Sequence, residues 1–343
     1  MGGQSRFGAA LAVRGKPAQR GNREPLPCLH VELMSWFKPW SETSIPWLEH
    51  AHRAARMLRR DVAHASPQQI RQAIELASRL NPGPWGGEFQ RVQEASWQGA
   101  VVTWKERDEG TLVWVHGGAF AFGSPQVYRA AAVHLARASR CKIVLPSYRL
   151  APEHAYPSAH EDVHRAVKHW SAQGEKMILI GDSAGGNLAL GAVAQMMADE
   201  GRGAGAFAGI AVLSPWCDLR TNAASVEVNA VAHSPFDHQD AEEYAAQYLG
   251  DRDRSSAAVS PLLGSYKGWP DMYLEYAEDE FLAPDVVELS QKLTQDQVSL
   301  TVRTEPQAVH GWQLLPDFLP ESKRSIAALA AWSRAQLGLP PLT

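Results

Sequence analysis

The stretch MILIGDSAGGNLALGAVAQMM, Met177 to Met197, decides the fold. Its first four residues are typical of a buried strand, and a long apolar helical pattern follows Gly185. Between them stands Ser183, in a Gly-x-Ser-x-Gly run that begins at Gly181. Such a tight turn needs small flanking residues and exposes the serine hydroxyl above the sheet. The following helix directs its N–H groups and positive dipole end at the same place. We therefore predict that Ser183 is a nucleophile at a strand-to-helix turn.

From Thr111 onward, short apolar runs alternate with helical patterns. This alternation predicts an α/β fold with a mostly parallel sheet covered by helices on both faces. Strands are expected at about 91–96, 100–105, 111–115, 141–146, 177–180, 209–214, 271–276 and 298–304. Helices are expected at about 125–138, 159–173, 185–200 and 284–295. A longer segment, about 218–262, is expected to be mostly helical.

The N-terminal part of the chain has a different character. Residues 35–80 are typical of helices, with Ser66-Pro67 as one helix start, and the breaker cluster 81–87 marks a boundary. We expect residues 1–33 to be a disordered extension, because the first 23 include basic residues and no acidic ones. Two other interpretations stay open: a transit peptide, and an upstream extension of a protein that begins near Met34.

Composition excludes several classes of protein. The chain has 343 residues, a net charge of −4 and 45% hydrophobic residues, as in a soluble globular protein without a nucleic-acid partner. Cys28, Cys141 and Cys217 are too few and too far apart for a disulfide framework or a metal site, which favours a cytoplasmic location. No apolar run reaches 18 residues, so no membrane span is expected.

A second motif follows the strand that ends at Val115. The chain turns there through His116-Gly117-Gly118-Ala119-Phe120. A strand followed by His-Gly-Gly can expose backbone N–H groups. We expect the N–H groups of Gly117 and Gly118, together with that of Ala184, to form an oxyanion hole. His116 is expected to brace this loop rather than to act as a base.

These motifs resemble the hormone-sensitive-lipase-like esterases, the bacterial family IV branch of the α/β-hydrolase superfamily. The resemblance extends over about 100–320 and includes SYRLAPEHAYPSAHED (147–162) and SPWCDL (214–219). Ala119 departs from the third glycine of many members, although its N–H is retained. The resemblance implies an α/β-hydrolase fold, with a catalytic domain at 86–343. Residues 34–85 and about 218–262 would form a helical cap.

The base and the acid are expected after the last two strands. His310 lies in AVHGWQLLP beyond the last predicted strand, which matches the chain order Ser, acid, His of α/β-hydrolases. The resemblance points to the same residue. For the acid, the acid-x-Leu frame of the family implies Glu280, followed by Phe281-Leu282. Asp279 stays open as the alternative, since most relatives use aspartate.

The resemblance implies a serine carboxylesterase that hydrolyses short- to medium-chain acyl esters and uses no metal or cofactor. Ser183, His310 and Glu280 would carry the reaction. An amidase or deacetylase of the formamidase type, with the same triad, stays open. A non-catalytic receptor on this fold is disfavoured, because such receptors tend to lose the histidine that is present here.

Position beside the motifs suggests the walls of the substrate pocket. They are expected to include Phe120, Trp216, Phe281 and Trp312. The last strand, 298–304, could pair with a second copy to form a homodimer.

Overall fold

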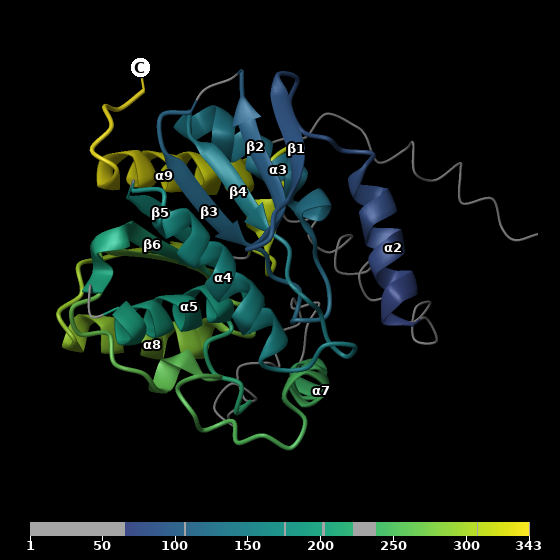
Figure 1. Cartoon of the computed structure of the whole chain (residues 1–343), viewed down its shortest axis with the longest axis vertical. Helices are drawn as coiled ribbons and strands as arrows, with labels where there is room; N and C mark the ends of the chain where they lie inside the picture. Colours follow the sequence, from purple (N-terminus) through teal and green to yellow (C-terminus); the bar gives the residue numbers. More distant parts are fainter. Residues whose placement is uncertain are drawn as a thin grey trace, which may run out of the picture. The chain divides into compact units, whose positions relative to one another are not determined.

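An eight-stranded sheet forms the centre of the computed structural model (Figure 1). The structure describes residues 66–105, 108–174, 176–200, 203–221, 238–306 and 308–342. The strand order is β1-β2-β4-β3-β5-β6-β7-β8. β2 runs antiparallel to β1 and β4, and the other neighbours are parallel. The strands are β1 (Gly87–Gln93), β2 (Gln98–Trp104), β3 (Thr111–Val115), β4 (Lys142–Pro146), β5 (Met177–Asp182), β6 (Phe207–Leu213), β7 (Met272–Ala277) and β8 (Leu300–Glu305).

Helices cover both faces of this sheet (Figure 1). One face packs against α4 (Ser158–Ser171), α5 (Ala184–Glu200) and α8 (Ala283–Gln295), and the other against α3 (Pro125–Ser139) and α9 (Pro320–Gln336). The remaining helices described are α2 (Pro67–Ser78), α7 (His238–Leu249) and the short 3₁₀ helices η2 (Gly203–Ala206), η3 (Pro261–Leu263) and η4 (Trp312–Leu314).

Alternation along the strands builds two hydrophobic cores. In β3, Val113 and Val115 join the core under α4, α5 and α8, whereas Leu112 and Trp114 join the core under α3 and α9. Successive side chains of a strand point to opposite faces, so a strand covered on both sides must be apolar throughout. The predicted α/β fold with a mostly parallel sheet is confirmed.

Two local predictions differ from the structure. The strand expected at 91–96 is β1, which begins at Gly87 and ends at Gln93, because the chain already turns where the Glu94 N–H donates to Trp97 O at 2.9 Å. α9 was not predicted. Its sequence, PESKRSIAALAAWSRAQ, is dominated by alanine and serine, which give a weak apolar pattern.

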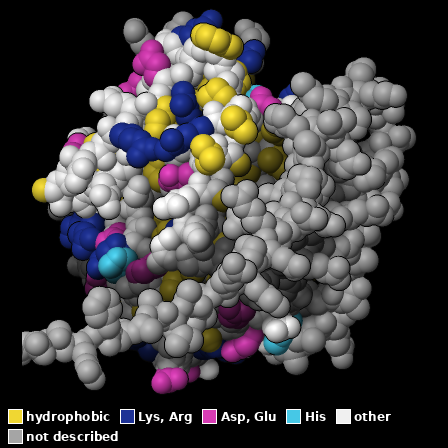
Figure 2. All heavy atoms as spheres, turned by 90° about the vertical axis from the view of Figure 1, so that its right-hand side faces the viewer, with side chains coloured by type: hydrophobic (Ala, Val, Ile, Leu, Met, Phe, Trp, Pro, Cys, Tyr) yellow, Lys and Arg dark blue, Asp and Glu magenta, His cyan; other side chains and the backbone are white. Residues whose placement is uncertain are grey.

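Of the predicted N-terminal cap segment, 34–85, the structure describes residues 66–85, which include α2; residues 1–65 and 222–237 lie outside the described residues. Ser66 caps the helix in a capping box with Gln69, and no residue of α2 is buried. Leu76 is 65% exposed and Trp85, just beyond the helix, 98%. Figure 2, which faces this side, shows exposed hydrophobic side chains beside a cluster of Lys and Arg.

Polar contacts attach α2 to the rest of the chain. Arg71 Nε donates to Ala121 O at 2.6 Å, its Nη2 donates to Ala151 O at 2.5 Å, and its guanidinium pairs with Glu153 at 2.9 Å. Ser124 Oγ donates to Glu75 at 2.8 Å. Both anchors end next to the loop that follows β3.

In the described ranges, none of the helices combines the length and hydropathy needed to span a bilayer. Nor do three or more His, Cys, Asp or Glu side chains of these ranges lie together in a metal-binding arrangement.

Arg334 joins α9 to the end of α3 and should be a main contributor to stability. Its guanidinium, 3% exposed, donates to Glu109 Oε2, Ser139 O and Pro340 O at 2.6–2.9 Å. Arg334→Ala would remove all of these buried hydrogen bonds and the ion pair with Glu109, so we expect the free energy of unfolding to fall by about 2–4 kcal/mol. Urea denaturation followed by circular dichroism measures this change.

Arg324→Ala on the same helix is the matched control. This side chain is 58% exposed and pairs with Glu305, so its loss should cost less than about 0.5 kcal/mol. Similar losses for the two variants would contradict the assignment.

Candidate active site

Ser183 stands at the sharp turn between β5 and α5. Its φ is +51°, in the left-handed region that a residue with a Cβ adopts at a cost. The turn is fixed on both sides, because the Ser183 N–H donates to Leu213 O at 3.0 Å and Ser183 O accepts from Trp216 N at 2.9 Å. A Cβ at Gly181 would lie 2.4 Å from Gly185 O, and one at Gly185 would lie 2.2 Å from Val115 O. Both glycines are therefore required by close backbone approach.

His310 connects Ser183 to Glu280. Its Nε2 lies 2.9 Å from Ser183 Oγ and its Nδ1 lies 2.7 Å from Glu280 Oε2. Glu280 is 2% exposed, and its other carboxylate oxygen accepts the Ala277 N–H at 3.3 Å. Asp279 is exposed, so the structure brings the glutamate of the predicted frame to the histidine, and not its neighbour.

The environment of His310 favours its protonated form. Burial opposes protonation, but the hydrogen bond that His310 donates to Glu280 and the charges of Glu280 and Asp182 outweigh it, and together they raise the pKa of His310 above its ordinary value of 6.5. An imidazole paired in this way can take a proton from Ser183 and hold it as a stabilised cation.

In the loop after β3, one of the N–H groups predicted to form the oxyanion hole has another partner. The Gly117 N–H donates to Tyr128 Oη at 2.7 Å, so it is occupied, and the prediction that it joins an oxyanion hole is wrong. Among the described residues we find no acceptor for the N–H groups of Gly118, Ala119 and Ala184. These three groups, rather than Gly117, are the ones free to bind an oxyanion.

A buried polar network connects this loop to the serine turn. Tyr128 donates its hydroxyl to Asp182 Oδ2 at 2.5 Å, and Trp114 Nε1 donates to Asp182 Oδ1 at 2.9 Å. Burial raises the pKa of Asp182 to about 6, while the two hydrogen bonds act in the opposite direction. The charge of ionised Asp182 supports the protonated form of His310.

His116 braces the loop. Its ring stacks on Tyr148 with centroids 4.1 Å apart, and the Tyr148 hydroxyl donates to His116 O at 2.7 Å. Burial lowers the pKa of His116 to about 4, so its imidazole is neutral at physiological pH.

An apolar cavity of about 290 Å³ lies beside Ser183. Of the four predicted walls, Trp216 and Phe281 line it. Phe120 does not, because its ring is buried face to face against Tyr248, with centroids 4.1 Å apart. Nor does Trp312, which is buried in a separate cluster with Ala277, Ala308 and Leu319. The cavity walls that the sequence did not reveal include Ile74, Phe122, Val127, Leu282 and Leu314.

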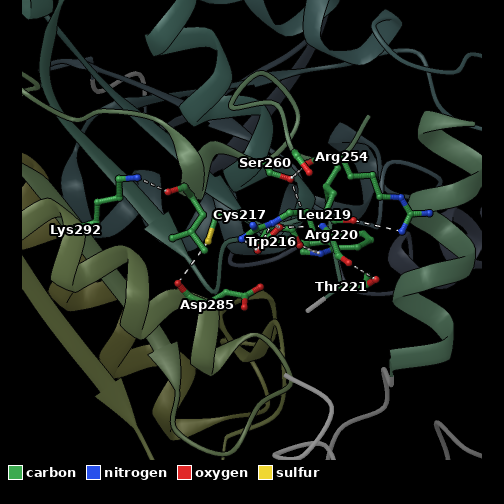
Figure 3. Close-up of polar contacts among 12 residues, drawn as sticks. Trp216, Cys217, Leu219, Arg220, Thr221, Arg254, Ser260, Asp285 and Lys292 are labelled. Atoms are coloured by element: carbon green, nitrogen blue, oxygen red, sulfur yellow. Dashed lines mark hydrogen bonds and ion pairs between the residues drawn. The ribbon is translucent and has the colours of Figure 1, made fainter. Parts of the chain in front are cut away.

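A network of hydrogen bonds fixes the segment that carries Trp216 (Figure 3). The indole N–H of Trp216 donates to Asp218 O at 3.0 Å, and the Leu219 N–H donates to Ser260 Oγ at 3.0 Å. Asn187 of α5 donates its Nδ2 to Trp216 O at 3.0 Å. The wall of the cavity is therefore anchored to the helix that begins at the serine turn.

Tyr128→Phe tests the buried network. The change removes the acceptor of the Gly117 N–H and the donor to Asp182 Oδ2, although Trp114 still donates to Asp182 Oδ1. We therefore expect a loss of about 1–3 kcal/mol in the free energy of unfolding. Chemical denaturation of the two proteins measures it. Tyr156→Phe is the control, since among the described residues we find no hydrogen bond to its hydroxyl. A loss no larger than that of Tyr156→Phe would refute the role of Tyr128.

Comparison with known proteins agrees with this geometry. Residues 112–314 match the family model of the alpha/beta hydrolase fold. An acetyl-hydrolase of Streptomyces hygroscopicus is 31% identical over 297 residues, which cover 80% of this chain and 98% of that protein. An esterase of Acinetobacter venetianus is 25% identical over 272 residues, covering 78% and 89% of the two chains.

The structural comparison gives the branch of the family. The crystal structure of an esterase from the bacterial hormone-sensitive lipase family superposes with a TM-score of 0.78 and 27% identity, and covers 87% of this chain and all of that one. The chain therefore belongs to the α/β-hydrolase family, in its hormone-sensitive-lipase-like branch of esterases.

Proposed function

We propose that this chain is a serine esterase that hydrolyses carboxylic esters through Ser183, His310 and Glu280. One observation carries the proposal: the imidazole of His310 lies 2.9 Å from the hydroxyl of Ser183 and 2.7 Å from the buried carboxylate of Glu280. The nucleophile, the base and the group that orients the base are thus in contact, as acyl transfer requires.

The reaction would proceed in two half-reactions. His310 Nε2 takes the proton of Ser183 as Oγ attacks the ester carbonyl carbon, and the N–H groups of Gly118, Ala119 and Ala184 hold the oxyanion. Collapse of the tetrahedral intermediate expels the alcohol, which receives the proton from His310. Water, deprotonated by His310, then attacks the acyl-enzyme and releases the carboxylic acid, and Ser183 regains its proton. Glu280 stabilises the imidazolium in both halves.

The size and the lining of the cavity support the proposal that the substrates carry short- to medium-chain acyl groups. It encloses about 290 Å³, and the charged side chains among its described walls are Asp182 and His310, which belong to the network and the triad. The remaining walls suit an uncharged acyl chain. The relatives named above are an acetyl-hydrolase and esterases, which does not favour the amidase alternative.

Several parts of the proposal remain predictions from the sequence. They are the division into cap and catalytic domain, the absence of a cofactor, a cytoplasmic location and a homodimer. β8 is an edge strand with Val302 exposed, which is compatible with pairing to a second copy.

Ser183→Ala should abolish hydrolysis of a p-nitrophenyl ester series from acetate to palmitate. Removing the nucleophile of a serine hydrolase lowers kcat by about 10⁴–10⁶-fold, so the residual rate should approach background. The wild type should be fastest on the shorter esters, because the cavity is small. Spectrophotometric rates check both points, and undiminished hydrolysis by folded Ser183→Ala would exclude this serine as the nucleophile.

Glu280→Gln should move the acid limb of the pH profile. Hydrolysis needs neutral His310, so kcat/KM should fall as pH decreases through the His310 pKa, which lies above 6.5 in the wild type. Removing the Glu280 charge lowers that pKa, because burial then acts with less opposition. The limb should shift to lower pH while kcat drops by about 10⁴-fold.

Asp279→Asn is the control for this shift, because Asp279 is exposed and lies next to Glu280 in sequence. It should leave the limb in place. A shift in Asp279→Asn, with none in Glu280→Gln, would reverse the assignment of the acid.

A further inference from the structure

Two tyrosines on one face of α7 contact the loop that carries the proposed oxyanion donors. Tyr244 and Tyr248 are one helical turn apart, so their side chains share a face. Tyr248 stacks on Phe120, with centroids 4.1 Å apart and planes 3° from parallel, and Tyr244 meets Phe122 edge to face at 5.6 Å. α7 thus packs against two residues of the same loop, Phe120 and Phe122.

The loop needs such support because its backbone is strained. Ala119 and Phe120 have φ values of +52° and +59°, and neither is glycine. Such residues typically cost about 1–3 kcal/mol each and persist only when the surroundings hold them. Phe120 is fully buried between Tyr248 and Trp216, whose ring centroid lies 5.7 Å away. Phe120, which directly follows Gly118 and Ala119 in the chain, is thereby fixed by its side chain.

Tyr248 is itself firmly held. Its hydroxyl lies 2.7 Å from His160 Nδ1 of α4, and its carbonyl accepts the Tyr156 N–H at 2.8 Å. α7 is anchored a second time through Glu242, which accepts from both Arg254 Nη1 and Nη2 and from Thr221 Oγ1 at 2.7–2.8 Å. The stack therefore fixes the loop against a rigid support.

We propose that Tyr248 is a positioning residue for catalysis: its ring, acting through Phe120, keeps the N–H groups of Gly118 and Ala119 aligned with the oxyanion. This inference rests on the esterase function proposed above. Tyr244 acts on a different property, because Phe122 lines the cavity. The two tyrosines of α7 therefore have different roles. Tyr248 affects stabilisation of the transition state, and Tyr244 affects how the bound acyl chain fits the cavity.

The test compares Tyr248→Leu, Tyr248→Phe and Tyr244→Leu with the wild type. Each protein is assayed for kcat and KM on the best p-nitrophenyl ester. Each is also assayed for inhibition by a trifluoromethyl ketone with the same acyl chain, whose adduct with Ser183 places an oxyanion in the hole. We expect Tyr248→Leu to lower kcat by about 10–100-fold, since a misplaced group can cost about 10²-fold. KM should change little, and the ketone should bind more weakly by a similar factor.

The other variants separate ring from hydroxyl and loop from cavity. Tyr248→Phe keeps the stack and loses only the hydroxyl contact with His160, so it should retain much more of kcat and ketone affinity than Tyr248→Leu. Tyr244→Leu should raise KM more than it lowers kcat. If Tyr248→Leu does not fold, Phe120→Leu breaks the same stack from the other side and should give the same loss of kcat.

Tyr273→Leu is the control for lost packing. Tyr273 is a buried tyrosine packed on Trp332 in the core under α3 and α9. It should lower the melting temperature without changing kcat or ketone affinity. Normal kcat in Tyr248→Leu and Phe120→Leu, or an equal loss in Tyr273→Leu, would overturn the positioning role while leaving the esterase proposal intact. A wild type that neither hydrolyses the esters nor binds the ketone would overturn both proposals.

Discussion

The site depends on the close approach of two parallel strands at their carboxyl ends. β3 and β5 are neighbours, so the loop after β3 and the serine turn after β5 occupy the same edge of the sheet. A Cβ at Gly185 would lie 2.2 Å from Val115 O, and one at Gly117 would lie 2.5 Å from Asp182 Oδ2. Only glycine allows these two segments to touch, and every proposed oxyanion donor belongs to one of them.

Around this contact, the protein combines strain with buried polar groups. Ser183, Ala119 and Phe120 all have left-handed backbones, and Asp182 is a buried carboxylate. Each of these features is unfavourable in isolation. Neighbouring side chains compensate for them. Tyr128 and Trp114 donate hydrogen bonds to Asp182, and the stack of Phe120 on Tyr248 holds the loop after β3. Stability and preorganisation of the site thus depend on the same side chains.

Much of this arrangement could be predicted from sequence, because local pattern and chain order determine the sheet, the serine turn and the histidine, while the family resemblance implied Glu280. Apolar runs covered on both faces give the parallel sheet. Ser183, Glu280 and His310 follow β5, β7 and β8, whose carboxyl ends lie on one edge. The parts that could not be predicted depend on contacts between distant segments. Tyr128 occupies the Gly117 N–H from α3, and Ile74 reaches the cavity from α2. Phe120 and Trp312 stand next to motifs, yet each turns into a core, because adjacency in sequence does not fix the direction of a side chain.

The histidine and the rest of the site come from separate parts of the sheet. The serine turn, the loop after β3 and the stack with α7 are attached to the central strands, whereas His310 is supplied by the segment after the edge strand β8. The proposed nucleophile and base thus come from different stretches of chain, and the segment after β8 also supplies Leu314 to the cavity. A substitution at His310 would remove the proposed base and one side chain of the cavity lining, while the other walls and their supports stay in place. Such a change retains most of the recognition surface, so the same fold can serve binding as well as catalysis.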